Sequence, residues 1–408
     1  MSRNVLFLSP GYPAEMPFFV RGLSEVGAKV LGLGDQAKEA LPAMARERLA
    51  FHQQVRSLWD EETVIAAVLD LARRVRIEQV ECLWEPGMIL AARLREALHL
   101  PGMTVEQTVP FRDKEKMKQV LDRAGIRTPR HTSTSTEAGV RRAAEEIGYP
   151  IIIKPISGAG SLDTHRCDGL ADLERVLPQV RHVQEVSVEE FIDGEEFTFD
   201  TICAGGRLLF ENVCWYRPRP LVQKQVEWVS PQSIGIRDLD QEELLGGRQM
   251  GREVLTALGF ATGFTHMEWF RKSDGEVVFG EIGGRPPGAR MVDVMNFVCD
   301  ADLFTGWAEA VVHGRIERQR LERKYNVAMV FKRAQGIGRI QRVEGLDRIL
   351  ADFGSFVRVV ELLPVGAPRR NWKNTVISDG FVVVRHPELQ ALLHMADRLA
   401  NDLHLYAG

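Results

Sequence analysis

A chain of 408 residues is too long for one compact core and indicates about two to four domains. Its hydrophobic fraction of 45% and charged fraction of 26% are those of a globular protein, and its net charge of −4 gives no reason to expect a nucleic acid or a membrane as partner. No apolar run approaches the roughly 18 residues that are needed to cross a bilayer. The five cysteines have no metal-binding spacing, and an odd count without a pattern is typical of reduced thiols in a cytoplasmic protein.

The first hundred residues alternate between continuous apolar runs and helical patterns. Apolar runs lie at 4–8, 29–34 and 79–85, and helical patterns reach about residue 27, cover about 61–76 and extend from about 87 to 99. Continuous apolar strands between helices are typical of a parallel sheet that is covered on both faces. Ligands often bind at the carboxyl ends of such strands, so the loop at 9–11 is either a ligand contact or a plain turn.

Two lysines mark the next region. Lys114 lies near the start of a charged helical pattern over 111–125, and another helix is expected at 136–147. Lys154 follows inside the apolar run YPIIIKP, where its charge is costly unless an anion or a carboxylate pairs with it. The segment Ser157-Gly158-Ala159-Gly160-Ser161 comes three residues later, and its backbone N–H groups suit phosphate oxygens. A glycine-rich loop alone is usually a turn, but a buried lysine directly before it favours a polyphosphate site.

An acidic segment and a proline-rich connection come next. In VSVEEFIDGEEFTFD, Glu189 and Glu196 bracket an Asp193-Gly194 turn, and either they bind the hydroxyls of a ribose or they protect an acidic edge strand. Residues 214–233, CWYRPRPLVQKQVEWVSPQS, are dense in polar and aromatic side chains. This composition is typical both of a loop that gates a substrate site and of a surface loop held by its aromatic residues.

The segment 264–290 carries the most informative pattern in the chain. Strand-like runs flank Asp274-Gly275, which is a strong signal for a two-residue hairpin turn. In that register Glu268 faces Glu281, and their Cβ atoms lie roughly 4.5–5.5 Å apart on one face. The same register pairs Phe270 with Phe279 and His266 with Gly283.

Two carboxylates at this separation repel each other unless a cation lies between them. A hard ion such as Mg²⁺ binds through one or two carboxylates and phosphate oxygens, so the hairpin is either a metal site or a solvated acidic face. Arg285 and Arg290 follow the second strand, and both have planar donor groups suited to a carboxylate or a phosphate.

The end of the chain has strand-like stretches beyond about residue 320 and another Asp-Gly turn at 379–380. A closing helix is expected from about Pro387. Its apolar stripe predicts a core face at Leu389, Leu392, Leu393, Ala396, Leu399 and Leu403.

Taken in order, these pieces resemble the ATP-grasp superfamily over about residues 110–310, and within it the branch of carboxylate–amine ligases that includes L-amino acid ligases. The pieces are the helix lysine, the strand lysine before a small-residue loop, the run EEFIDGEE and the Glu-hairpin-Glu-Ile-x-x-Arg block. The resemblance implies an α/β fold that is α+β in the clamp. Its expected parts are an N-terminal αβα pre-ATP-grasp domain (1–110), a first ATP-grasp part with the small lid subdomain (111–190), a catalytic subdomain with the metal hairpin (191–320) and a mixed C-terminal extension (321–408).

The resemblance also implies roles for the site residues. The phosphates of ATP would be bound by Lys114, Lys154 and the loop with Ser157, Gly158, Gly160 and Ser161. The nucleoside would be bound by Glu189 and Glu196 and by the backbone of Glu190, Phe191 and Ile192. Mg²⁺ or Mn²⁺ would be held by Glu268 and Glu281, and the reacting phosphate or carboxylate by Arg285, with Arg290 as second candidate. One departure is Gly283, where the family usually has Asn, so that water or His266 would have to fill the space.

The function implied by this resemblance is an ATP-dependent ligase that converts a small-molecule carboxylate into an acyl phosphate and joins it to an amine. ADP and phosphate are released, and two amino acids are one possible pair of substrates. A homodimer is the assembly that the resemblance suggests. The alternatives are a biotin-carboxylase-like enzyme, a formate-dependent purine-biosynthesis enzyme and, because of Gly283, a nucleotide-binding regulatory protein without turnover.

Overall fold

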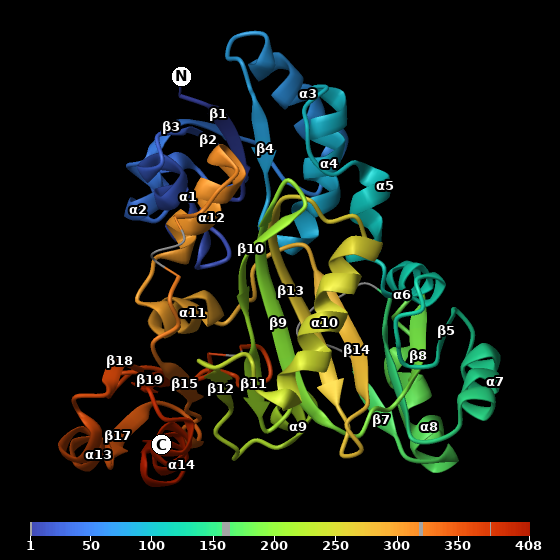
Figure 1. The fold of residues 1–408 in the computed structure, drawn as a ribbon, viewed down its shortest axis with the longest axis vertical. Helices are drawn as coiled ribbons and strands as arrows, with labels where there is room; N and C mark the ends of the chain where they lie inside the picture. The colour runs from blue at the N-terminus through green and yellow to red at the C-terminus, as the bar shows by residue number, and fades with distance from the viewer. Residues whose placement is uncertain (1, 157–163, 318–320, 376) are drawn as a thin grey trace.

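The N-terminal part of the structure is a parallel sheet with helices on both faces (Figure 1). The computed structural model describes residues 2–156, 164–317, 321–375 and 377–408. The sheet has the strand order β3-β2-β1-β4, with β1 (Asn4–Leu8), β2 (Lys29–Gly34), β3 (Leu49–Gln54) and β4 (Gln79–Glu81). Helices of this part are α1 (Met16–Glu25), α2 (Ala43–Arg46), α3 (Glu61–Ala72), α4 (Met88–Ala97) and α5 (Val105–Thr108). Alternate side chains of β1 pack on opposite faces, Phe7 towards α1 and Leu6 towards α3 and α4, as the continuous apolar run predicts.

A small antiparallel sheet, here called the lid, follows with the strand order β5-β8-β6-β7. Its strands are β5 (His131–Thr134), β6 (Ile151–Pro155), β7 (His165–Cys167) and β8 (Val186–Glu190), and its helices are α7 (Glu137–Ile147) and α8 (Leu170–Val176). Ile151, Ile153 and Val188 pack against these two helices. Because side chains alternate along a strand, Lys154 and Glu189 lie on the other face, towards α6 (Lys114–Arg123).

A nine-stranded sheet forms the centre of the molecule, with the order β14-β13-β9-β11-β12-β15-β19-β18 and β10 paired to β9. Its first strands are β9 (Glu195–Ala204), β10 (Arg207–Asn212), β11 (Cys214–Arg217), β12 (Gln232–Gly235), β13 (Gly263–Arg271) and β14 (Val277–Gly283). One face packs on α10 (Glu242–Ala257), and the other on α11 (Met291–Cys299) and α12 (Leu303–His313), which also contact the N-terminal part. The short helix α9 (Pro220–Gln225) lies between β11 and β12.

The C-terminal residues extend this same sheet. β15 (Asn326–Phe331) pairs with β12, and β19 (Gly380–His386) and β18 (Val357–Leu362) continue the order. The remaining elements are α13 (Leu346–Phe353), α14 (Leu389–Asp402) and a three-stranded sheet of β16 (Gln335–Gly336), β20 (His404–Ala407) and β17 (Ile340–Glu344). The predicted core stripe of the last helix is confirmed, because Leu392, Ala396 and Leu399 are fully buried.

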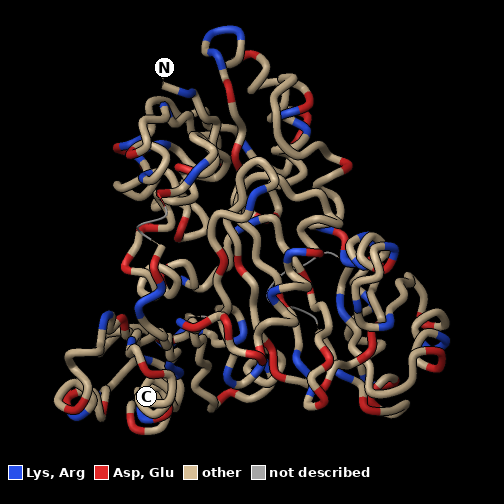
Figure 2. Tube along the Cα trace, in the orientation of Figure 1, with Lys and Arg blue, Asp and Glu red and all other residues tan. Residues whose placement is uncertain are grey.

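Lys and Arg are interspersed with Asp and Glu along the traced chain (Figure 2). Many of these charges pair at the surface, for example Arg141 Nε with Glu174 Oε1 at 2.7 Å on the lid. Among the described residues, no helix combines the length and the apolar character that a membrane span requires.

The hairpin of β13 and β14 has the predicted register at the end away from its turn. The pairs Glu268–Glu281 and His266–Gly283 are present, whereas Phe270 faces Val278 and Trp269 faces Phe279. The predicted pair Phe270–Phe279 is therefore wrong.

Two opposite one-residue shifts explain this result. The loop has three residues and not two, since Lys272 N donates to Glu276 O at 2.9 Å and Gly275 takes a left-handed φ of +88°. Gly280 then forms a bulge that shifts the register back. A Cβ on Gly280 would lie 2.8 Å from Glu268 O, so the close approach of the strands there requires glycine.

Candidate functional site

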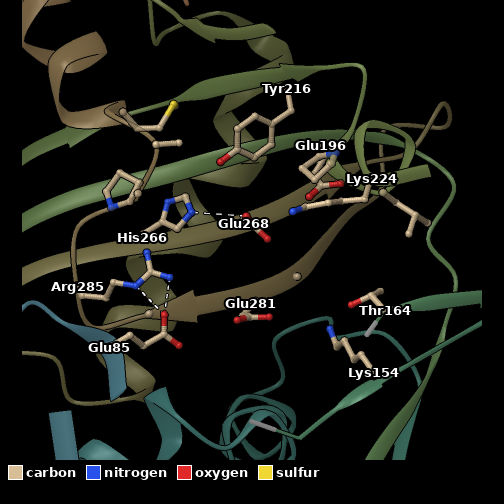
Figure 3. A pocket seen from close by; sticks show the side chains of 18 of the residues that line it. Glu85, Lys154, Thr164, Glu196, Tyr216, Lys224, His266, Glu268, Glu281 and Arg285 are labelled. Atoms are coloured by element: carbon tan, nitrogen blue, oxygen red, sulfur yellow. Dashed lines mark hydrogen bonds and ion pairs between the residues drawn. The ribbon is translucent and has the colours of Figure 1, made fainter. Parts of the chain in front are cut away.

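A cavity of about 630 Å³ lies where the lid, the nine-stranded sheet and the N-terminal part meet. Figure 3 shows Glu196, Glu268 and Glu281 on one side of it and Lys154 on the other. Predicted site residues that line it are Lys114, Lys154, Glu189, Glu190, Phe191, Ile192, Glu196, Glu268, Glu281 and Arg285. The predicted loop residues Ser157, Gly158, Gly160 and Ser161 lie outside the described part of the chain.

On the lid side, two lysines share one buried carboxylate. Lys154 Nζ lies 2.9 Å from Glu189 Oε2, and Lys118 donates to Glu189 Oε1, which also accepts from Ser187 Oγ at 2.8 Å. Burial by itself would raise the pKa of Glu189, but the two ammonium groups outweigh it and lower that pKa. Both oxygens of Glu189 thus have partners within the protein, but a carboxylate has about four acceptor sites and Glu189 lines the cavity, so its predicted contact to the nucleoside stays a prediction. Its position between the lysines makes Glu189 an internal counter-ion.

Burial acts on the two lysines with different results. The pKa of Lys118 is lowered to about 8 by burial, which Glu189 only partly offsets. Burial also disfavours the charge of Lys154, but the carboxylates of Glu189 and Glu281 raise its pKa above the ordinary value. Lys154 therefore keeps a firm positive charge on the surface of the cavity.

The hinge, residues 190–192 between the lid and the nine-stranded sheet, is held in place by arginine side chains. Arg127 donates to both oxygens of Glu190, at 3.2 and 3.1 Å. The guanidinium groups of Arg166 and Arg219 lie 4.0 and 4.9 Å from the ring centre of Phe191. Arg219 also donates to Ile192 O at 2.8 Å. These contacts fix the backbone of 190–192 at the wall of the cavity.

Three carboxylates gather on the side formed by the large sheet. Burial and then the nearby charge of Glu268 raise the pKa of Glu196 to about 8, although Arg219 Nε lies 3.5 Å from Glu196 Oε2. For Glu281, burial acts in the same direction, but Lys114, whose Nζ is 3.4 Å from Glu281 Oε1, helps to lower the pKa. On this side of the cavity, Arg219 and Lys114 therefore lie beside two of the three carboxylates.

His266 adds a partner for Glu268. Its Nδ1 lies 2.6 Å from Asp200 Oδ1, and its Nε2 lies 3.5 Å from Glu268 Oε1. Burial would lower the pKa of His266, but the two carboxylates raise it to about 9. Asp200 gave no signal in the sequence because it comes from a different strand, β9, 66 residues earlier.

Arg285 lines the cavity but is not free. Its Nε and Nη2 lie 2.7 and 2.5 Å from Glu85 Oε2, and Nη1 donates to Pro286 O at 2.9 Å. Glu85 also pairs with Arg112. Nη1 and Nη2 of Arg285 each retain one further N–H, so the guanidinium can still donate to an anion in the cavity.

Arg290 itself does not line this cavity, although Ala289 and Met291 on either side of it do. Its side chain pairs with Asp293, and its Nη1 is 3.8 Å from Glu361 Oε2. The backbone of Arg290, at a left-handed φ of +62°, turns the chain into α11, and its N–H donates to Glu15 Oε1. Its ion pairs and its absence from the cavity lining disfavour the substrate contact of Arg290, which stays a prediction.

Several residues at or next to the cavity were not predicted. Lys118, which is buried against Glu189 and does not line the cavity, has a weak signal, since it lies one helical turn after Lys114. Tyr216, Arg219 and Lys224 come from the segment 214–233, whose composition had indicated either a gating loop or a surface loop. Of the N-terminal loop, residues 9–11 do not line the cavity, but Tyr12, Pro13 and Glu15 do.

The donor set fits a hard divalent cation that completes its coordination with oxygens from a ligand. No group of three or more His, Cys, Asp or Glu residues in metal-holding geometry occurs in the described ranges. Glu268 and Glu281 nevertheless face each other in register, and both line the cavity. Two carboxylates are what Mg²⁺ takes from a protein when phosphate oxygens and water supply the rest.

A family model of the ATP-grasp domain matches residues 119–294, which contain the lid, residues 190–192 and the hairpin of β13 and β14. The chain therefore contains an ATP-grasp domain, and its overall fold is the mixed α/β ATP-grasp fold.

One solved structure aligns along the whole chain. It is the L-amino acid ligase from Bacillus licheniformis, with a TM-score of 0.79, 21% sequence identity and coverage of 100% of this chain and 99% of that one. At that identity the likeness shows the fold.

Relatives in sequence are named for more than one activity. The chain is 28% identical over 219 residues to the L-arginine-specific L-amino acid ligase of Bacillus subtilis, an alignment that covers 51% of this chain and 52% of the relative. It is 25% identical over 305 residues to the formate-dependent phosphoribosylglycinamide formyltransferase of Wolinella succinogenes, covering 71% and 75%. The chain thus spans about half the length of the first of these relatives.

Proposed function

We propose that this protein is an ATP-dependent carboxylate–amine ligase that forms an amide bond through an acyl phosphate. The observation that carries the proposal is one cavity with a cationic wall and an acidic wall. Lys114 and Lys154 provide the first, and Glu268 and Glu281 the second. A polyphosphate with its divalent cation has both kinds of charge, so such a pair of walls suits it.

In this proposal, different residues of the chain bind the phosphates, the nucleoside and the metal ion of ATP. Lys154, held by Glu189, binds phosphate oxygens from the lid side, and Lys114 does so from the start of α6. The backbone of 190–192 and the Glu196 side chain lie where the hinge offers polar contacts to a nucleoside. Glu268 and Glu281 would hold Mg²⁺, which when bound neutralises phosphate charge and aligns the phosphates.

The reaction proceeds in two steps that need little covalent help from the protein. An oxygen of the substrate carboxylate attacks the γ-phosphorus of ATP, ADP leaves, and an acyl phosphate forms. The amine nitrogen then attacks the acyl carbon, phosphate leaves, and the nitrogen loses a proton to give the amide. The remaining N–H groups of Arg285 are placed to bind the carboxylate or the transferred phosphate, with Glu85 fixing the guanidinium.

Exclusion of water is essential to this chemistry, because water hydrolyses an acyl phosphate. The lid, the segment 214–233 and the N-terminal residues Tyr12 and Pro13 contribute to the walls of the cavity. Two amino acids are one substrate pair that this arrangement suits, in line with the activity named for the Bacillus subtilis relative.

The test is ADP release by the purified protein with Mg²⁺ and ATP against a matrix of amino acids and carboxylic acids, with products identified by mass. Amide products whose formation matches ADP release are expected. Bicarbonate and formate belong in the matrix, because turnover with either one alone would favour the carboxylase or purine-biosynthesis alternative. Tight ATP binding without ADP release on any pair would contradict the ligase and favour a nucleotide-binding regulator.

A further inference from the structure

His266 is held rigidly on the acidic wall of the cavity. Asp200, which orients it through Nδ1, is fully buried and also accepts from Thr198 Oγ1 at 2.7 Å and from Asn212 Nδ2 at 3.3 Å. Asn212 Oδ1 accepts in turn from Arg323 Nη2 at 2.8 Å. Rotation of the imidazole would break this buried chain of hydrogen bonds, so the ring has one fixed orientation. Its Nε2 faces Glu268 (Figure 3).

The position opposite His266 has no side chain. Gly283 pairs with His266 across the hairpin, two residues beyond Glu281. A Cβ on Gly283 would have Arg285 Cγ as its nearest neighbour, at an ordinary contact distance of 3.5 Å, so packing does not require glycine there. The strand β14 therefore offers nothing at position 283 that can steady the carboxylate of Glu268.

We propose that His266 is a positioning residue for Glu268 and takes the place of the side chain that β14 lacks at position 283. This inference rests on the proposed function, since the carboxylate would be held ready for the Mg²⁺ that accompanies ATP. A glutamate side chain has freely rotating bonds, and a fixed neighbour reduces the number of orientations that the metal must select among. Partners that orient a metal ligand in this way are worth about 10–100-fold in metal affinity.

The experiment measures Mn²⁺ binding, by electron paramagnetic resonance, to the full chain with a saturating non-hydrolysable ATP analogue. His266→Ala is expected to raise the Kd of Mn²⁺ by about 10–100-fold while the affinity for the analogue without metal stays unchanged. Asp200→Asn acts through the ring and is expected to shift the Kd in the same direction by a smaller factor. Thr265→Val is the matched control. Thr265 is the neighbour on β13, and its hydroxyl pairs with Thr201 at 2.5 Å on the opposite face of the strand.

A second pair of variants separates positioning from general disturbance. Gly283→Asn in the His266→Ala background adds a carboxamide at the position that pairs with residue 266, and partial recovery of Mn²⁺ affinity is expected. His266→Gln, which keeps a donor for Asp200, replaces His266→Ala if thermal unfolding shows that the alanine variant does not fold.

The outcomes distinguish this inference from the function on which it rests. A wild-type protein that binds Mn²⁺ with the analogue, together with a His266 variant whose Kd lies within about twofold of it, would overturn the inference and leave the ligase proposal standing. A wild-type protein that binds neither analogue nor Mn²⁺ would overturn both.

Discussion

The lid wall and the hairpin wall of the cavity differ in how their charged side chains are paired. On the lid wall, Lys118 and Lys154 share one carboxylate, Glu189, so that the cations are partly neutralised from within and one positive charge remains. On the hairpin wall, burial and then the nearby charge of Glu268 raise the pKa of Glu196 to about 8. The charge of the lid wall thus suits phosphate oxygens, whereas the hairpin wall brings Glu268 and Glu281 together in register, which suits a divalent cation.

Removal of the shared counter-ion is expected to have the largest effect. Glu189→Gln leaves two buried ammonium groups facing each other, and the free energy of unfolding should fall by about 3–5 kcal/mol in urea denaturation. Glu190→Gln, next along β8, is the matched control with a smaller loss, since Glu190 is more exposed and pairs with Arg127. Lys118→Met added to Glu189→Gln should restore part of the loss. If Glu189→Gln is as stable as the control, the lid wall does not depend on internal neutralisation.

The second-largest effect is expected for the loss of Lys154 on the lid wall. Lys154→Met removes the charge that faces the phosphates, and kcat for ADP release should fall by about 10²–10³-fold, as for the loss of one preorganised electrostatic donor. Lys116→Met, an exposed lysine on α6, controls for the loss of a positive charge. Near-normal turnover of Lys154→Met would remove this residue from the phosphate site.

On the hairpin wall, Glu281→Gln neutralises one hard oxygen ligand. The Mg²⁺ concentration that gives half-maximal rate should rise by at least about 10–100-fold, because even an indirect partner of a metal ligand has an effect of that size. Glu276→Gln, next to the loop of the same hairpin, should leave the Mg²⁺ concentration for half-maximal rate unchanged. An unaltered Mg²⁺ dependence of Glu281→Gln would contradict a cation on this wall.

The raised pKa of Glu196 predicts a pH dependence that is specific to the hairpin wall. The folded protein keeps a proton on this carboxyl up to a pKa of about 8, whereas the unfolded chain releases it near the ordinary value. Between those pKa values the folded state binds more protons, so stability should fall as pH rises, by up to about 1.4 kcal/mol per pH unit. Glu196→Gln should flatten this fall between pH 6 and 8 in thermal unfolding. An identical pH profile would show that Glu196 is ionised at neutral pH.

The smallest effect is expected for Arg290, which belongs to neither wall. Arg290→Ala should change KM by less than about twofold and lower stability by roughly 1 kcal/mol, because it removes only partly exposed ion pairs with Asp293 and Glu361. Steady-state kinetics and urea denaturation provide both numbers. A large rise in KM would return Arg290 to the substrate site, as its place in the sequence had predicted.

The sequence predicted the parts of the site that lie close together along the chain. Glu268 and Glu281 were found because an Asp-Gly loop sets the register of one hairpin. That result depended on two register shifts, caused by a third loop residue and by the Gly280 bulge. The shifts cancel at Glu268 and Glu281 but not at Phe270. Lys154 was found because a lysine inside an apolar strand needs an anionic partner.

The partners of these residues come from distant segments and left no local pattern. Glu85 reaches Arg285 across 200 residues, and Asp200 reaches His266 across 66, through sheet order and domain packing that periodicity does not encode. The occupation of Glu189 by two lysines also depends on α6 lying against the lid.

Anomalous diffraction from a crystal grown with Mn²⁺ and a non-hydrolysable ATP analogue tests the central claim most directly. The account predicts a manganese peak between the carboxylates of Glu268 and Glu281, with the phosphates of the analogue reaching from it towards Lys154 and Lys114. A nucleotide bound outside this cavity, or a manganese peak away from both carboxylates, would contradict it.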